Sequence, residues 1–336
     1  MLVNKRVRLV DVAEASKTSI KTVSRVLNND ERVSDETRER VQKIMNDLGY
    51  QVDIIARSLR TGVDKVIGVV IPKIGDPFFA ELVEEIAEFA IERGISVIVG
   101  STHGRLEREN ELVQGFIQRR VMGMIIAPQE LDYAFLKKVS IPTVFIDRAP
   151  NKFKGDLVRV DDEFGGKLAT NHLIKFGHKR IAYFADSLKI RSTELRYKGF
   201  KEALEVAKLK LDKEIIFVNL NPAKNLDATI AKILNLENPP TAIFSPKAEF
   251  SISIVSALHK IKRTDVALIS FDDFTLASSI QPSITVLDHS AREIGRESVR
   301  RLFEKIDGSE DKPKEYIIGL NVIERGSGEL RAKVKL

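Results

Sequence analysis

The sequence predicts a small all-α head of the helix-turn-helix type followed by an α/β core made of two doubly wound lobes. The first observation is a set of three short amphipathic helical segments within the first 50 residues. The second is a change of pattern at Lys65, after which short β-branched runs alternate with amphipathic helical segments. That alternation is typical of parallel sheets with helices on both faces. It runs through two successive series, and this third observation predicts two lobes.

The head is organised around residues 18–29, which are predicted to form a short helix with two different faces. Val23, Val26 and Leu27 recur at the spacing of one apolar stripe, and Ser19 can cap the first turn. The opposite side and the start of the helix are polar or exposed. One face is therefore expected to pack in a core while the other stays available to a partner.

Two further helices complete this head. Residues 9–15 precede the central helix by a turn of about three residues, and a third helix is expected from Ser34 to Gly49. Two helices at that separation match the helix-turn-helix, whose second helix presents its N-terminal side chains to base edges in the major groove. On pattern alone, a three-helix bundle without a ligand is the alternative. Residues 51–62 follow and could form at most a two-turn helix, which is marginal alone in water.

The α/β core is expected to alternate strands and helices from residue 66 onward. The last helix, about residues 291–306, and the strands 316–318 and 321–323 are expected to return to the first lobe. Predicted strands are 66–71, 95–99, 121–127, 143–147, one near 157, 180–185, 214–218, 241–245 and 266–270. The helices between them are predicted at 78–93, 105–119, 164–176, 193–208, 226–236 and 249–261. Paired sheets of this kind usually bind a ligand at the carboxyl ends of their strands, between the lobes.

These residues resemble the lactose-repressor family of bacterial transcription regulators over nearly the whole chain. In the head, the matching motifs are Asp-Val-Ala at 11–13, Ser-x-x-Thr-Val-Ser-Arg-Val-Leu-Asn at 19–28, and Leu-Gly-Tyr at 48–50. In the core, the landmarks include 76–82, 119–126, 141–148, 173–182, 196–200, 271–273 and 281–286. The resemblance implies a periplasmic-binding-protein-like core. The expected domains are a DNA-binding head at 6–50, a hinge at 51–62, and a core at 63–328, with lobe 1 at 63–160 plus 291–326 and lobe 2 at 161–290.

The resemblance implies contacts with double-stranded operator DNA from both the head and the hinge. By resemblance, Leu59 is the apolar wedge inserted into the minor groove; the alternative is an ordinary linker contact. Lys17 stands in the turn where the family usually has glycine. The expected DNA-binding residues are Thr18, Ser19, Ile20, Lys21, Thr22, Arg25, Asn28, Arg57, Leu59 and Arg60.

The expected effector pocket centres on Arg196 and Asp272. A guanidinium suits a bidentate grip on vicinal hydroxyls or a carboxylate, and Asp272 matches the family residue that accepts hydrogen bonds from the effector. The alternatives are an ion pair of Arg196 with Glu194 or Glu202, and a capping role for Asp272.

The other expected pocket residues are Phe78, Phe79, Asp147, Arg148, Phe244 and Lys247. One phenylalanine ring of the first pair can stack on the ligand, although aromatic residues at a helix start also pack in cores. Asp147 and Arg148 can line the cleft or bridge the lobes. Lys247 stands where relatives commonly carry an amide; if it faces the cleft it favours an anionic ligand, and otherwise it points to solvent.

Composition restricts the function further. The chain of 336 residues has no cysteine, no apolar signal core and no run long enough for a membrane span, so we expect a cytoplasmic protein. The first 62 residues carry twelve basic and nine acidic side chains, half of the net charge of +6, which favours a polyanion partner there. The five histidines lack metal-ligand spacing, and no nucleotide loop or nucleophile motif is present. No cofactor, metal site or catalytic residue is expected.

The leading hypothesis is a homodimeric repressor controlled by a small molecule, with a sugar or sugar derivative as the first candidate. The alternatives are a regulator that responds to a non-sugar metabolite such as a nucleobase, and a solute-binding protein without DNA function. An enzyme that uses the α/β core is a third class, but it lacks the necessary motif.

Overall fold

The computed structural model describes residues 7–27, 29–50, 64–129, 132–220 and 226–332, which form two compact units divided after Asp64. The first unit is the three-helix head, with α1 (Leu9–Ala15), α2 (Ile20–Leu27) and α3 (Asp35–Asp47). Its core consists of side chains from all three helices and the loop before α3, and the predicted apolar stripes supply most of it. The buried members are Val12, Ala13, Val23, Val26, Val33, Val41 and Met45.

The helix ends of the head follow from single residues. Ser19 Oγ accepts a hydrogen bond from the backbone N–H of Thr22 at 3.0 Å, which confirms the predicted cap of α2. Gly49 has a φ of 63° after α3, a left-handed conformation that glycine adopts without steric cost. Ser34 occupies the N-cap position of α3, but its hydroxyl donates to Thr37 Oγ1 instead of capping the backbone. Lys17, in the turn between α1 and α2, also has a left-handed φ, of 51°.

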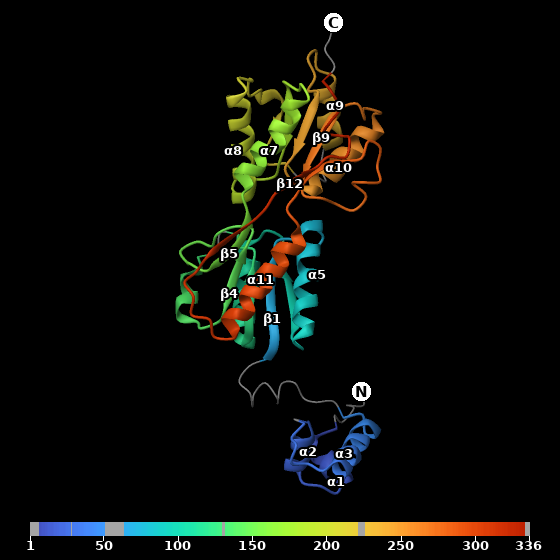
Figure 1. Ribbon diagram of the computed structural model, residues 1–336, viewed down its shortest axis with the longest axis vertical. Coiled ribbons are helices and arrows are strands. Elements are labelled where there is room, and N and C mark those ends of the chain that lie inside the picture. The colour runs from blue at the N-terminus through green and yellow to red at the C-terminus, as the bar shows by residue number, and fades with distance from the viewer. Residues whose placement is uncertain (1–6, 28, 51–63, 130–131, 221–225, 333–336) are drawn as a thin grey trace. The chain divides into compact units, whose positions relative to one another are not determined.

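The first lobe of the second unit contains a six-stranded sheet in the order β11-β5-β4-β3-β1-β2. The strands are β1 (Asp64–Ile71), β2 (Ser96–Ser101), β3 (Val121–Ile126), β4 (Thr143–Ile146), β5 (Asp156–Val160) and β11 (Glu315–Ile318). Around it lie α5 (Pro77–Glu92), α6 (Leu106–Arg119), the short 3-10 helix η1 (Tyr133–Lys138) and α11 (Ala291–Ile306) (Figure 1).

The second lobe repeats this plan with the strand order β12-β10-β9-β8-β6-β7. Its strands are β6 (Ile181–Phe184), β7 (Ile216–Phe217), β8 (Ala242–Ser245), β9 (Ala267–Phe271), β10 (Thr285–Asp288) and β12 (Asn321–Ile323). Its helices are α7 (Asp162–Lys175), α8 (Arg191–Val206), the short η2 (Lys213–Ile215), α9 (Leu226–Leu234) and α10 (Ala248–Lys260). The predicted fold class, a helical head with two doubly wound α/β lobes, is therefore confirmed.

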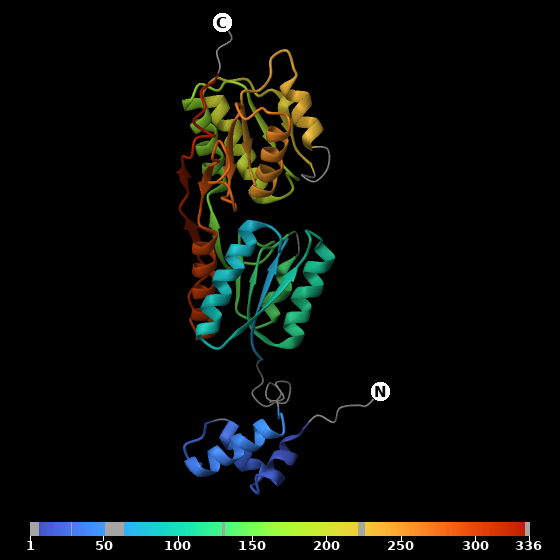
Figure 2. The ribbon, with the colours of Figure 1, turned by 90° about the vertical axis from the view of Figure 1, so that its right-hand side faces the viewer.

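The chain passes between the lobes after β5, after β10 and after β11. Figure 2 shows α11 against the first lobe and the C-terminal segment continuing along the second. The expectation that both last strands return to the first lobe is wrong for β12, which pairs antiparallel with β10, with Val286 opposite Ile323. Sequence patterns also did not reveal β10, a short strand that supplies the partner for β12.

Close backbone packing fixes α7 against α8. A Cβ added at Gly166 would lie 2.2 Å from the carbonyl oxygen of Arg196, and one at Gly199 would lie 2.1 Å from that of Glu163. Only glycine permits this approach at either position. The two helices therefore hold Asp162 and Arg196, which they carry, in one relative position.

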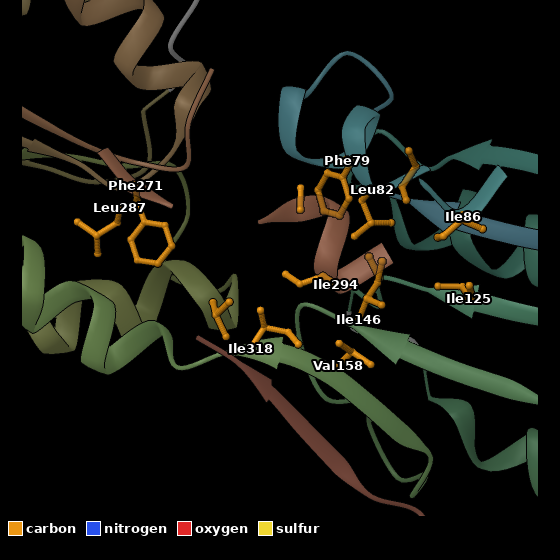
Figure 3. Packing of buried hydrophobic residues seen from close by; sticks show 14 of the residues in the cluster. Phe79, Leu82, Ile86, Ile125, Ile146, Val158, Phe271, Leu287, Ile294 and Ile318 are labelled. Atoms are coloured by element: carbon orange, nitrogen blue, oxygen red, sulfur yellow. The ribbon is translucent and has the colours of Figure 1, made fainter. Parts of the chain in front are cut away.

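Buried aliphatic and aromatic side chains form the core of both lobes. Figure 3 shows Phe79, Leu82 and Ile294 in the first lobe and Phe271 with Leu287 in the second. All of these side chains are nearly or fully inaccessible to solvent. Within the described part of the chain, no helix combines the length and hydrophobicity that a membrane span requires.

Candidate functional site

The start of α2 presents an exposed surface on the head. The side chain of Ile20 is 52% exposed, and Lys21 beside it is also exposed. Thr18 and Ser19 are held locally, because Thr18 Oγ1 lies 2.9 Å from Ser16 Oγ and Ser19 Oγ lies 2.9 Å from Thr22 Oγ1. The hydroxyls therefore shape the turn, while Ile20 and Lys21 project from it.

Arg25 lies one turn further along α2. Its Nε is 4.0 Å from Asp30, a loose ion pair, because Asp30 is already bound by Arg32 through two short hydrogen bonds. The side-chain hydrogen bonds from Arg32 hold the pKa of Asp30 far below its usual range. Arg25 is thus a half-exposed cation. Four other predicted DNA-binding residues, Asn28, Arg57, Leu59 and Arg60, lie outside the described residues.

In the second unit, Arg196 anchors the candidate effector site. Its Nε donates to Asp162 Oδ1 at 2.7 Å and its Nη1 to the carbonyl oxygen of Pro246 at 2.6 Å. The guanidinium carbon lies 3.6 Å from the ring centroid of Phe271, a cation–π contact. Oδ2 of Asp272 lies 3.8 Å from Nη1 of Arg196. The side chain is buried, so these contacts fix its position before any ligand binds.

The partners of Arg196 differ from the alternatives that the sequence offered. Glu194 pairs with Arg191, and Glu202 pairs with Lys167. The true partner, Asp162, lies in the first turn of α7 and is fully buried. Sequence patterns did not reveal it, because Asp161, its neighbour, supplies the helix cap that such an acidic pair predicts.

Asp272 lies directly after β9 with a φ of 71° and is buried. Its Oδ1 has no hydrogen-bond partner among the described residues, and neither has Nδ1 of His289, 3.4 Å away. Burial lowers the pKa of His289 to about 3, so the imidazole is neutral at physiological pH. Burial also raises the pKa of Asp272. Buried polar atoms are usually hydrogen-bonded, so these two adjacent atoms are available to bind a polar group.

Asp147 and Arg148 follow β4 in the first lobe and pair with each other. Arg148 donates from Nε and Nη2 to Oδ2 of Asp147, at 2.9 and 2.6 Å. Burial alone would raise the pKa of Asp147, but the charges of Arg148, Arg196 and Lys247 together lower it. Because Arg196 and Lys247 belong to the second lobe, this charge interaction crosses the space between the lobes. The pair itself is local and does not bridge them.

Lys247 lies between β8 and α10, and its ammonium forms an ion pair with Asp186, which follows β6. Asp186 also accepts a hydrogen bond from Thr193 Oγ1 at 2.9 Å. The charge of Lys247 lowers the pKa values of Asp76, Asp147 and Asp272 relative to burial alone. These acidic groups lie in both lobes, and the Lys247 side chain is only 20% exposed.

The predicted aromatic residues divide between pocket and core. Phe78 is half-buried, and its ring centroid lies 5.0 Å from that of His289. Together with Asp272 and Asp273 they line a small pocket between the lobes. Phe79 is 6% exposed and packs in the core. Phe244 has no exposed surface, and its ring contacts Tyr183 and Phe200. The assignment of Phe244 to the pocket is therefore wrong, because β8 is buried on both faces.

Asp76 joins this site without having been predicted as a pocket residue. It caps α5 by accepting a hydrogen bond from the backbone N–H of Phe78 at 3.1 Å. Burial, followed by the negative charge of Asp272 in the opposite lobe, raises the pKa of Asp76 to about 6. A capping motif alone does not reveal such a role, because Asp before Pro at a helix start is common.

A separate, larger groove also lies between the two lobes. The first lobe contributes Gln129, Arg148 and Asn151, and the second contributes Lys189 and Ile190. The two sets come from the loops after β3, β4 and β6. The carboxyl ends of parallel strands thus surround the space, as the fold class predicts.

One possible metal-ligating group occurs in the described ranges, formed by His172, Glu324 and Glu329. Glu329 lies 2.5 Å from His172 Nε2 and also accepts from Thr285 Oγ1 at 2.7 Å. The contacts of Glu329 with His172 and Thr285 attach the C-terminal tail to the second lobe. Sequence spacing could not reveal it, because His172 and Glu329 are 157 positions apart.

The comparison with known proteins decides the family. Residues 8–53 match the model for bacterial regulatory proteins of the lacI family, and residues 170–328 match the periplasmic binding protein-like domain. The ribose operon repressor of Halalkalibacterium halodurans is 31% identical over 304 residues, covering 88% of this chain and 89% of the relative. The chain belongs to the lacI family.

Other members of the lacI family agree with this assignment. The HTH-type transcriptional repressor PurR of Aliivibrio salmonicida is 28% identical over 327 residues, covering 94% of this chain and 97% of that protein. A crystal structure of the lac repressor dimer, bound to operator and the anti-inducer ONPF, superimposes with a TM-score of 0.82. The identity is 26%, and the match covers 96% of this chain and 99% of the other. This lacI-family chain is accordingly a DNA-binding transcription regulator and not an enzyme.

Proposed function

We propose that this regulator represses transcription as a homodimer on a near-palindromic operator in the cytoplasm, and that a neutral, hydroxyl-rich sugar bound between its lobes controls it. A two-fold dimer doubles the contacts that a single small head can make. Several relatives are repressors by name, and the similar lac repressor was crystallised as a dimer on operator. The surface for base contacts is the start of α2, where Ile20 and Lys21 are exposed.

The polar groups between the lobes support the choice of effector. Unpartnered Asp272 Oδ1 can accept hydrogen bonds from hydroxyl groups, and Arg196 is fixed beside it. A hydroxyl-rich ligand supplies many donors to such acceptors without bringing charge. This unsatisfied acceptor beside a fixed guanidinium is the observation that carries the proposal.

The ion pair of Lys247 argues against an anionic effector. Asp186 already balances the ammonium, so Lys247 does not supply an uncompensated positive charge. Beside Asp272, the carboxyl groups of Asp76, Asp147 and Asp162 gather with the guanidinium groups of Arg148 and Arg196, whereas Lys189 and Arg191 line the separate groove. An anion would therefore meet more negative than positive charge. The sequence position of Lys247 suggested a preference for anionic ligands such as sugar phosphates. That preference remains a prediction, and the surrounding carboxyl groups argue against it.

A thermal-shift screen tests the effector class directly. Ligands that bind only the folded state raise the melting temperature. We expect neutral pentoses or hexoses to raise it more than their phosphates or acids, and to lose that effect in Asp272→Asn. Asp227→Asn, which removes a surface carboxylate paired with Lys260, is the matched control and should keep the full shift.

Two outcomes would overturn the effector assignment. Larger shifts with sugar phosphates, abolished by Lys247→Ala, would support the anionic ligand instead. Shifts with nucleobases alone would instead support a nucleobase effector, and would identify the contact of Phe78 with His289 as a stacking site. Operator binding measured on the same samples reports separately on the head.

A further inference from the structure

The strands of the first lobe bring their amino-terminal ends to one edge. β11, β5, β4 and β3 run parallel to one another, and β1 runs parallel to β2. The backbone N–H of Ala127, just after β3, bonds to the carbonyl oxygen of Val70 near the end of β1, so these two strands also run in the same direction. The carboxyl ends face the interlobe site, and the amino-terminal ends therefore lie at the opposite end of the lobe.

Basic residues precede or begin nearly every strand at this opposite end. Lys65 is the second residue of β1, Arg119 and Arg120 stand immediately before β3, and Lys154 stands two residues before β5. All of them are exposed. We call the following set the basic end: Lys65, Arg119, Arg120, Lys138, Lys154 and Lys312.

The charges of the basic end are free. None of its six cations forms an ion pair or hydrogen bond with another described side chain, whereas Arg93 and Lys152 nearby are paired with Asp307 and Asp132. The unpaired acidic residues in the same loops are Glu92 and Glu310. At the corresponding end of the second lobe, Arg180 before β6 binds Asp212 and Glu214, and Arg263 before β9 binds Asp265. Exposed lysines without a described ion pair also occur there, among them Lys208, Lys210 and Lys262. The chain from the head enters the first lobe, however, so these lysines provide the comparison.

The position of β1 indicates which polyanion the basic end binds. Residues 51–63 join Tyr50 of the head to Asp64 at the start of β1. Even a fully extended chain of that length spans at most roughly 45 Å. β1 begins at the basic end, because Lys65 is its second residue. The length of the connecting chain therefore limits how far DNA bound by the head can lie from this end.

We propose that the basic end binds the phosphate backbone of DNA flanking the operator. It adds sequence-independent affinity to the specific contacts of the head, because each phosphate neutralised by a lysine or arginine releases condensed counterions. Lysine and arginine side chains are the groups that proteins most often place against backbone phosphates.

Two lengths of DNA test this proposal with the full-length protein. An operator is first selected from random duplexes and then prepared either ending at its edges or extended by about two helical turns on each side. The variant is Lys65→Gln, Lys154→Gln and Lys312→Gln combined. We expect it to bind the short duplex as the unmodified protein does, but to bind the extended duplex several-fold more weakly. The slope of log affinity against log salt should fall by about 0.9 for each phosphate that the variant no longer neutralises.

A matched variant separates this surface from the total charge. Lys208→Gln, Lys210→Gln and Lys262→Gln remove the same charge from exposed positions of the second lobe, and should leave both affinities unchanged. Equal weakening on the two duplexes, or in both triple variants, would show a general charge effect and overturn the proposal. An unchanged affinity and salt slope on the extended duplex would also overturn it, and would leave an acidic protein as the partner of this surface. Melting temperatures confirm that all variants are folded.

Discussion

Arg196 donates to Asp162 at 2.7 Å, and both side chains are buried. Complete burial raises the pKa of Asp162, while the adjacent guanidinium opposes that rise. Removing one partner of a buried ion pair leaves the other charge without compensation, which typically costs about 3–5 kcal/mol. We therefore expect Arg196→Met to lower the free energy of unfolding by that amount in urea titrations, and to remove the response to effector.

The same relationship predicts a rescue. Arg196→Met combined with Asp162→Asn should be more stable than Arg196→Met alone, because the buried carboxylate that Arg196 binds directly is then replaced by a neutral amide. Lys167→Met, which breaks a partly exposed pair with Glu202, should cost less than about 1 kcal/mol. If the double variant showed the sum of two independent destabilising effects, the two side chains would not act as a pair.

Asp76 predicts how stability depends on pH. Its folded-state pKa, about 6, lies above the usual value near 4, so between these values the folded protein binds a proton that the unfolded chain releases. This group therefore makes the protein less stable as pH rises from 4 through 6. Asp76→Asn keeps the cap of α5 and removes the penalty, and should stabilise the protein at pH 7.5 by about 1–2 kcal/mol.

The measurement is the difference in unfolding free energy between Asp76→Asn and the unmodified protein, without effector. It should be small near pH 4.5 and grow until about pH 7. A difference that stayed constant over this range would mean that the carboxyl group of Asp76 titrates normally in the folded protein.

Replacing Lys17 by glycine should make the head more stable. Its φ of 51° places a side chain in a left-handed conformation that costs about 1–2 kcal/mol for residues other than glycine. Because glycine also loses more entropy on folding, Lys17→Gly should stabilise the head by a net amount of about 0.5–1 kcal/mol. Lys43→Gly, within α3, should instead destabilise it by about 1 kcal/mol. Hydrogen exchange of the head amides in the full chain can measure both, and a loss of stability in both variants would contradict the strained turn.

Substitution of Lys21 should lower the affinity for DNA without lowering the stability of the head. It is exposed at the start of α2, and Lys21→Ala should weaken binding to a selected operator by about 1–3 kcal/mol if it contacts a base edge. Lys43→Ala, exposed on α3, is the control for removing one charge from the head. Unchanged affinity and specificity in both Lys21→Ala and Arg25→Ala would refute the assignment of this face.

The architecture was predictable because local patterns determine it. The stripe Val23, Val26 and Leu27 gave α2, and β-branched runs such as 66–71 gave the parallel strands. Sequence could not separate pocket from core within a buried strand, which is why Phe244 was misplaced while Phe78 was retained. The partnership of Asp162 with Arg196 was also hidden, because it depends on two glycines that let α7 and α8 touch.

Short edge elements escaped prediction for a similar reason. β10 covers four residues and β12 three, too few for periodicity to distinguish them from loop. Their pairing is set by the long return of the chain from the first lobe. The same holds for the basic end, whose residues are scattered in sequence and gather only because the strands are parallel.

The short strand β12 also protects the molecule from its own neighbours. It covers the edge of β10, while Glu329 and His172 hold the following residues against the same lobe. A chain truncated after residue 320 would expose the backbone donors and acceptors of β10, and open strand edges recruit further chains. The last dozen described residues therefore reduce self-association by covering this edge. Shortening the chain to improve expression would lower its solubility.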